Sequence, residues 1–251
     1  MAREILDKIS DIVTFANQTE DENIRRSIEK RILSYHNASM SYYFATHATF
    51  RILTKEHGKI VLDSNDPTLN YYFARFVDKT DFFAHEKVVL DSKDPYLNYL
   101  FARAIPISDI QAHGKVVIDS KDLRINYLFA RDVKGSDVLS HGKVIIESGD
   151  LSYNYLFAKD VRGSDVLSHG RVIIESDDYD YNYAFLKDIG GADAQSHFFV
   201  IKRKMVERIE SHIIGTLEDD SDKLDDIILE IDKIKKLDKK GRKSNKKSYY
   251  N

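Results

Sequence analysis

The sequence contains no cysteine, only three prolines and no long run of apolar residues. The lack of cysteine excludes disulfide bonds, thiolate metal sites and cysteine catalysis, and it fits a reducing cytoplasm. Three prolines and eleven glycines argue against a loop-rich or collagen-like chain. No apolar run approaches the ~20 residues of a bilayer-spanning helix, and the N-terminal residues lack the pattern of a secretory signal. We therefore expect a cytoplasmic protein that makes no membrane contact.

The charge is unevenly distributed along the 251 residues, although 42% hydrophobic and 31% charged residues together predict a soluble, folded chain. Residues 233–251 contain nine Lys or Arg and one acid, a net charge of +8. The total is −3, so residues 1–232 carry −11. This pattern predicts an acidic body followed by a basic tail.

Residues 122–149 and 150–177 are two copies of one 28-residue segment. Between them 22 of 28 positions are identical, and three of the six differences are exchanges of Lys and Arg. A fixed period of this kind is typical of a repeat array. A degenerate first unit begins at Asn37 and has one extra residue before His57. The other units follow at a strict spacing of 28 residues and begin at Asp66, Asp94, Asp122, Asp150 and Asp178.

Each repeat contains signals for two helices. The opening Asp is a helix N-cap residue, and Pro67 and Pro95 stand at the first helical position, where a missing N–H is harmless. Gly135 suits the left-handed residue after a helix, and Asp137 begins a second helix. The alternative is a strand in the Val- and Ile-rich end of each repeat. We predict an all-α fold, an αα-hairpin solenoid with right-handed superhelical stacking and helical caps at both ends.

The helical pattern divides the chain into four parts. Residues 1–36 form an N-terminal helical cap, in which Thr19 and Glu22 make a capping box for the second helix. Residues 37–201 form the solenoid of about six repeats. In residues 202–238 we expect C-terminal capping helices, the first running past Met205 and the last beginning at Ser221. Residues 239–251 lack apolar periodicity and are predicted to be a disordered basic tail.

Stacking converts each repeated position into a column of side chains. The Asn column is predicted to be structural, with each amide bonded to the backbone of a neighbouring turn or repeat, and ligand contact is the alternative. Its members are Asn70, Asn98, Asn126, Asn154 and Asn182. The His column suggests metal binding or pH sensing, but rungs about 8–10 Å apart cannot share a zinc ion. We predict that its members lie in the core: His57, His85, His113, His141, His169 and His197.

A glycine follows most of these histidines and indicates a close helix crossing, because glycine in mid-helix costs about 1 kcal/mol relative to alanine. The motifs HExxH, GxxxxGK[ST] and GxSxG and the EF-hand loop are all absent from the sequence. We therefore expect a non-enzymatic protein that has no metal and no cofactor.

An aromatic–cation column is the candidate binding surface, because Tyr precedes Arg or Lys by four residues in the five repeats that begin with Asp. A stripe of Tyr and Arg beside variable positions suits a protein surface. The alternative is that the cations form inter-repeat ion pairs with Asp63, Asp91, Asp119, Glu147 or Glu175. The column contains Tyr71, Arg75, Tyr99, Arg103, Tyr127, Arg131, Tyr155, Lys159, Tyr183 and Lys187.

The basic tail is the candidate site for nucleic acid, because clustered lysine and arginine attract phosphate. The alternative is that it only maintains solubility. Its candidate residues are Lys239, Lys240, Arg242, Lys243, Lys246 and Lys247.

The repeat segment NYLFARDVKGSDVLSHGKVIIES resembles short tandem repeats in uncharacterised open reading frames of bacteriophages and large DNA viruses, over residues 37–201. The resemblance implies a viral protein in the host cytoplasm and implies no particular activity. The first functional hypothesis is a protein-binding module that inhibits a host or antiviral-defence factor. The alternatives are nucleic-acid binding through the tail and homo-oligomeric assembly through the caps.

Overall fold

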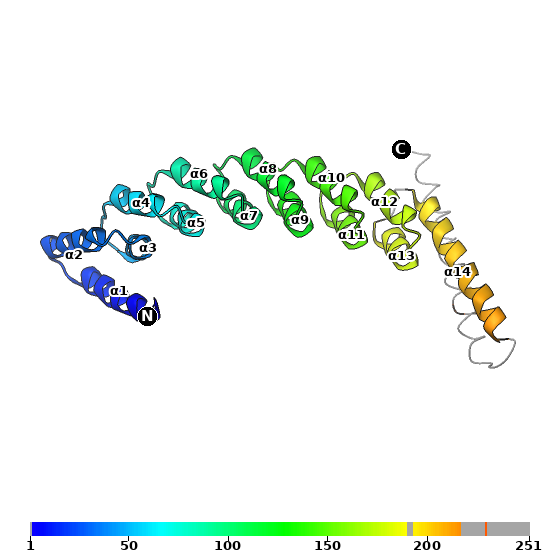
Figure 1. Cartoon of the computed structure of the whole chain (residues 1–251), viewed down its shortest axis with the longest axis horizontal. Helices are drawn as coiled ribbons and strands as arrows, with labels where there is room; N and C mark the ends of the chain where they lie inside the picture. The colour runs from blue at the N-terminus through cyan, green and yellow to red at the C-terminus, as the bar shows by residue number, and fades with distance from the viewer. Residues whose placement is uncertain (1, 190–192, 217–228, 230–251) are drawn as a thin grey trace. The chain divides into compact units, whose positions relative to one another are not determined.

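The computed structural model describes residues 2–189, 193–216 and 229. The described residues form fourteen α-helices and no strand (Figure 1). The helices are α1 (Ala2–Gln18), α2 (Glu22–Ser34), α3 (Ala38–His47), α4 (Thr54–Asp63), α5 (Pro67–Phe76), α6 (Phe82–Ser92), α7 (Pro95–Ala104), α8 (Ile110–Ser120), α9 (Leu123–Asp132), α10 (Val138–Ser148), α11 (Leu151–Asp160), α12 (Val166–Glu175), α13 (Tyr179–Asp188) and α14 (Ala194–Thr216). The prediction of an all-α array of helical hairpins is confirmed, and the strand alternative is wrong.

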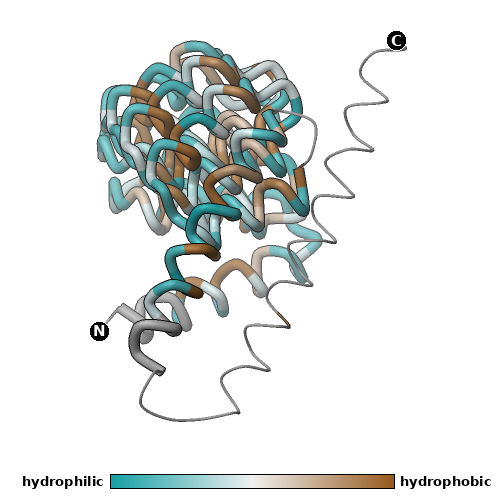
Figure 2. The backbone as a smooth tube through the Cα atoms, turned by 90° about the vertical axis from the view of Figure 1, so that its right-hand side faces the viewer, coloured by the Kyte–Doolittle hydropathy of each residue, from teal (hydrophilic) through white to brown (hydrophobic). Residues whose placement is uncertain are grey.

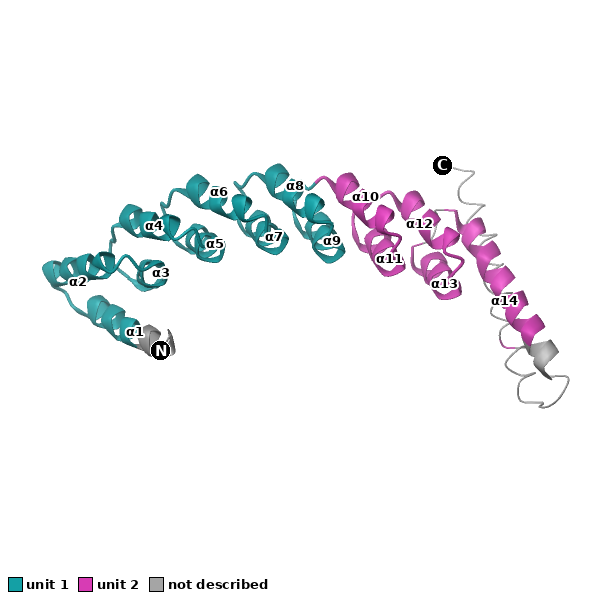
Figure 3. Ribbon diagram, viewed as in Figure 1, with its two compact units in different colours: residues 1–136 teal, residues 137–251 magenta. Residues whose placement is uncertain are grey.

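Odd-numbered helices from α3 to α13 are the first helices of the repeats, and even-numbered helices from α4 to α14 are the second. The chain forms two compact units, residues 1–136 and 137–251 (Figure 3). In the first unit α5 packs on α6 and α7 packs on α8, while first helices contact first helices and second helices contact second helices. The second unit repeats this arrangement, with α11 on α12 and α13 on α14. Each unit is therefore a two-layer stack.

The local signals place the helix ends largely where the sequence predicts them. The Asp66 carboxylate accepts hydrogen bonds from the N–H groups of Thr68 and Leu69, and Asp137 caps α10 in the same way through Ser140. Gly135 has φ of 87°, the left-handed conformation that the connection between the two helices of a repeat requires. One prediction is wrong. The N-cap of α2 is Asp21.

Thr19 was the predicted N-cap of α2, as part of a capping box with Glu22. Its hydroxyl instead accepts a hydrogen bond from the Asp21 N–H, just before the helix. Asp21 then accepts from the first free N–H groups of α2. Either side chain can cap a helix. The chain uses the one that directly precedes the helical residues.

The core is a ladder of phenylalanines, one from each first helix. Polar and apolar residues alternate along the coils of the helices, as Figure 2 shows. The apolar face of each first helix carries a Phe that is at most 1% exposed. The ladder residues are Phe44, Phe73, Phe101, Phe129, Phe157 and Phe185. Burying one aromatic ring per repeat stabilises each rung of its unit.

Helices also lie at the two ends of the described part. Ile9 and Val13 of α1 are buried with Ile32 of α2 and Phe44 of α3, so these two helices cover the end of the stack. Helix α14 has 23 residues and runs past Met205, which is fully buried. The predicted last helix from Ser221 and the basic tail lie outside the described residues.

Candidate functional site

The Asn and His columns form one buried hydrogen-bond network. The Asn98 Nδ2 group donates to the Val89 carbonyl, 3.1 Å away, and to the Asp94 carbonyl at 2.8 Å. Because both amide hydrogens are used, Asn98 Oδ1 faces His113 Nδ1, which lies 2.7 Å away and donates to it. The network ties the second helix of one repeat to both helices of the next. The prediction that the Asn amides bond to the backbone of a neighbouring turn or repeat is confirmed.

The same contacts recur in both compact units. Asn Oδ1 lies 2.6 to 2.8 Å from His Nδ1 in the pairs Asn70–His85, Asn154–His169 and Asn182–His197. Each His ring also packs on the Phe of its own hairpin, with centroids 5.0 Å apart for Phe73 and His85 and 4.5 Å for Phe185 and His197. The histidines are 0% exposed, which confirms that they lie in the core.

Burial controls the protonation of these rings. It lowers the pKa of His85, His113, His141, His169 and His197 to about 4. The rings are therefore neutral at pH 7. In the pairs with a bonded Asn, the proton is on Nδ1, and Nε2 carries a lone pair. No group of three or more metal-ligating side chains occurs among the residues that the structure describes.

Two glutamates occupy the space beside Nε2, and neither was singled out from the sequence. Glu86 takes the place of the usual Gly after His, and its Oε1 accepts from the Asp109 N–H at 2.6 Å while lying 3.3 Å from His113 Nε2. Burial raises the pKa of Glu86, and the hydrogen bond from Asp109 opposes this effect. The sequence does contain a signal for this site, because Glu86 is a glutamate at a position where most repeats have glycine.

Glu29 fills the corresponding space in the N-terminal cap. Its Oε1 accepts from the Leu53 N–H at 2.5 Å and lies 3.5 Å from His57 Nε2. Burial opposes ionisation of Glu29, but hydrogen bonds from His57 and Leu53 and the charge of Arg26 lower its pKa overall. Because Glu29 precedes the repeats, no column in the sequence could identify it.

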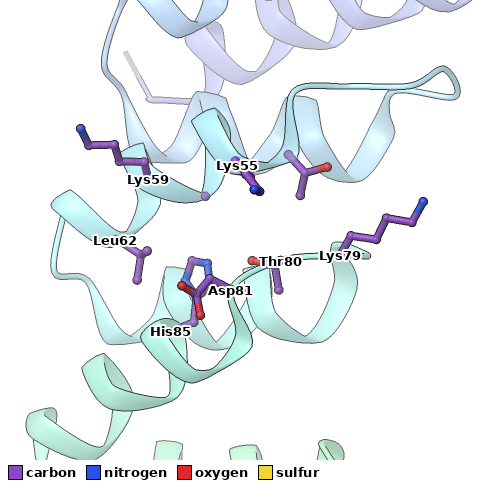
Figure 4. Close-up of a pocket in the computed structure, with 9 residues that line it drawn as sticks. Lys55, Lys59, Leu62, Lys79, Thr80, Asp81 and His85 are labelled. Atoms are coloured by element: carbon purple, nitrogen blue, oxygen red, sulfur yellow. The ribbon is translucent and has the colours of Figure 1, made fainter.

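Between Glu29 and Glu86 along the stack, the equivalent residue is Gly58, which supplies no carboxyl group. A pocket of about 490 Å³ lies at this position, lined by residues of α4, of α6 and of the loop before α6. The His85 ring and the Thr80 hydroxyl lie beside the space between these helices, with Lys59 and Lys79 extending away from it (Figure 4). His85 Nε2 and Thr80 Oγ1 are both buried and make no hydrogen bond.

The aromatic–cation column has a different environment from the one that the sequence predicted. Tyr71, Tyr99 and Tyr127 are buried, at 1%, 3% and 7% exposure, whereas their cation partners are exposed. Tyr71 lies on the side of its helix that faces the next repeat, with its ring centroid 6.1 Å from that of Phe101. Tyr155 and Tyr183 are half-buried, and Lys187 is exposed. A binding role for the column stays a prediction.

Four of the five predicted Tyr–cation pairs are in contact. The hydroxyl oxygen of the tyrosine accepts from the residue four positions later at 2.6 Å for Arg75, 3.1 Å for Arg103 and Arg131, and 2.9 Å for Lys159. The tyrosine hydroxyl also donates to a carboxylate of the next repeat. The Tyr99 hydroxyl donates to Asp132 Oδ2 at 2.7 Å, and Tyr155 donates to Asp188. These hydrogen bonds link successive repeats.

Three of the five carboxylates expected to pair with the column cations have other partners. Lysines of the same helix approach them in exposed i,i+4 pairs: Lys87–Asp91 at 2.7 Å, Lys115–Asp119 at 3.0 Å and Lys143–Glu147 at 3.7 Å. These pairs contribute little to stability because water screens them. Lys159 instead forms an inter-repeat ion pair at 2.9 Å with Asp188, the acid that follows the column cation of the next repeat.

Large apolar side chains are exposed at one repeated position, the second residue of the second helix. Phe83 is 71% exposed in α6, and Leu139 and Leu167 are 63% and 60% exposed in α10 and α12. Ile107, in the loop before α8, is 68% exposed. Exposed apolar residues that recur at one position favour contact with another molecule. The candidate tail residues from Lys239 to Lys247 lie outside the described residues.

Comparison of the chain with protein-family models, with curated proteins and with solved structures finds no match. Over the part of the chain that the structure describes, no helix combines the length and apolar character needed to cross a bilayer.

Proposed function

We propose that this protein is a non-enzymatic module that binds another protein through the exposed apolar residues at the start of its second helices. The supporting observation is the exposure of Phe83, Leu139 and Leu167 at the same position of their repeats. Leu139 and Leu167 stand one repeat apart on helices that contact each other. Apolar anchors of this size, held on a regular scaffold, suit a partner that buries them at the centre of an interface.

The resemblance of the repeat to those of phage and large-virus proteins supports a more specific form of this proposal. In that form the partner is a host or antiviral-defence protein, and the chain inhibits it in the host cytoplasm. The aromatic–cation column would then contribute exposed cations such as Arg131 and Lys159 at the edge of the interface.

Capture of binding proteins by the immobilised full chain tests the proposal. The double variant Leu139→Ser/Leu167→Ser should lose the bound partner by more than about tenfold, because truncating central apolar anchors removes most of the binding energy. The matched control is Lys143→Ser/Arg171→Ser, which changes exposed residues of the same two helices. If every captured protein binds both variants equally well, the apolar residues are not the site. A wild-type dimer that the leucine variant abolishes would instead identify homo-oligomeric assembly.

A further inference from the structure

The pocket at Gly58 contains buried polar atoms that the chain itself leaves without partners. Its walls include Gly58 of α4, Thr80 of the loop, and Asp81 and His85 at the start of α6. His85 is 0% exposed, and its Nε2 atom makes no hydrogen bond. Leaving such an atom unpaired beside a cavity is costly, and a ligand with a suitable polar group would remove that cost.

The two neighbouring positions in the same unit show which group fits. Between α2 and α4, and again between α6 and α8, a glutamate carboxyl oxygen lies between an N-cap N–H and a histidine Nε2. The carboxyl groups come from Glu29 and Glu86, which are 0% and 5% exposed. The fold therefore builds a carboxyl-binding arrangement at each of these positions, from one backbone donor and one imidazole.

Gly58 occupies the position of Glu86 but provides no carboxyl group. The groups around Gly58 match those around Glu86. The N–H of Asp81, the N-cap of α6, corresponds to that of Asp109, the N-cap of α8, and His85 corresponds to His113. The Asp81 N–H donates to no acceptor among the described residues. A Cβ at Gly58 would lie 3.6 Å from His85 Nε2, compared with 3.3 and 3.2 Å for Gly142 and Gly170 and their histidines. Of these three glycines, Gly58 leaves the most room beside the imidazole.

We propose that the pocket at Gly58 binds a carboxyl group from outside the chain, with one carboxyl oxygen held between the Asp81 N–H and His85 Nε2. Its volume of about 490 Å³ exceeds that of a carboxyl group, so it also accepts the carbon chain of the ligand. Lys55, Lys59 and Lys79 line the pocket and attract an anion, against the single charge of Asp81. The proposal does not depend on the protein-binding function proposed above.

The protonation of His85 makes ligand binding at this site depend on pH. The ring is neutral near pH 7, because burial lowers its pKa to about 4. An oxygen and a lone pair on Nε2 repel each other unless a proton lies between them, so binding takes up one proton. The charged groups around the site are Asp81 and the three lysines, of which Lys59 and Lys79 extend away from it. Affinity should fall about tenfold for each pH unit above the pKa values of the free groups.

Titration of the ¹⁵N-labelled full chain with propionate tests the proposal. We expect a saturable shift of the Asp81 backbone amide and of His85 Nε2, and no such shift with propylamine, a cation that has no oxygen to accept from the Asp81 N–H. Glutarate and the peptide acetyl-Ala-Glu-Ala-amide distinguish a small acid from an acidic side chain, by which of the two binds more tightly. If propionate produces no saturable shift, or if propylamine gives the same shift, the proposal is wrong.

Two variants provide matched controls. Gly58→Glu supplies an internal carboxyl group at the site, as Glu86 does in the next repeat, and should abolish the propionate shift at Asp81. Glu86→Gly opens the equivalent position between α6 and α8 and should add a propionate-dependent shift at Asp109. This second variant keeps the test decisive if Gly58→Glu does not fold. A wild-type response that persists in folded Gly58→Glu, or a silent Asp109 in Glu86→Gly, would overturn the proposal.

Discussion

His113 Nδ1 lies 2.7 Å from Asn98 Oδ1, although 15 residues separate the two along the chain. This contact joins two columns that the sequence shows only as separate repeats. Because the Asn98 amide also donates to the carbonyls of Val89 and Asp94, one side chain satisfies three buried polar groups. The stack is therefore held together by specific hydrogen bonds as well as by its phenylalanine ladder.

Asn98→Ala should lower the free energy of unfolding by about 3 kcal/mol. The substitution leaves the buried His113 Nδ1–H without a partner, which costs about 1–3 kcal/mol, and it removes two hydrogen bonds to backbone carbonyls that keep other donors. Urea unfolding followed by circular dichroism measures the change. Lys115→Ala, an exposed change on the same hairpin, should remain within about 0.5 kcal/mol of the wild type. Equal losses in the two variants would show that the network contributes no specific stability.

The stability of the protein should fall steeply in mild acid. The folded-state pKa of five core histidines is about 4, below the unfolded value of about 6.5. The unfolded chain therefore binds more protons, and stability that is fully present above about pH 6.5 is lost as the pH falls toward 4. Between these two pH values, each ring should lower the free energy of unfolding by about 1.4 kcal/mol for each pH unit of acidification.

Urea unfolding between about pH 7.5 and about pH 4.5 measures this dependence. His169→Gln removes one titrating ring. The slope of the unfolding free energy against pH should therefore become shallower by the amount that corresponds to one proton. A stability that is constant across the window, or a slope that the variant leaves unchanged, contradicts the prediction.

Glu86→Gln should retain most of the stability of the protein, whereas Glu86→Ala should lose about 1–3 kcal/mol. Glutamine keeps an oxygen that can accept from the Asp109 N–H and adds a donor for His113 Nε2. Alanine leaves the Asp109 N–H without its acceptor. Thermal unfolding of the two variants compares them directly. If glutamine destabilises as much as alanine does, the carboxylate charge matters more than the hydrogen bonds.

Tyr99→Phe should destabilise the chain by about 1 kcal/mol, because it removes the hydrogen bond from the Tyr99 hydroxyl to Asp132 while keeping the buried ring. A double-mutant cycle with Asp132→Ala measures the coupling between the two residues. Tyr96→Phe is the control, since Tyr96 is 49% exposed and its hydroxyl makes no hydrogen bond among the described residues. A coupling energy near zero would mean that this contact does not link the repeats.

Several features of the fold follow directly from local sequence signals. Asp66 and Asp137 begin helices because a short side-chain oxygen can bond the first free N–H groups, and this effect needs no tertiary contact. The placement of His113 in the core could also be predicted, because helical spacing puts it on one face with apolar residues. Glu86 could have been found as an exception within the Gly column.

The burial of Tyr99 was not predictable in the same way. Its spacing correctly places it beside Arg103, but that spacing cannot show whether a further helix covers the same face. In a stack, a first helix is flanked by the first helices of the repeats before and after it, so more than one of its faces is buried. The sequence pattern of a single helix does not contain that information.

The sequence alone therefore determined the period of the array, most of its helix ends and the place of its His column in the core. These features depend on interactions within a few residues, which the order of the amino acids specifies. The tertiary structure alone decided that His113 meets Asn98, that Glu86 fills the space beside His113, and that the space at Gly58 stays open beside His85. These contacts depend on the distance and angle at which one repeat packs on the next.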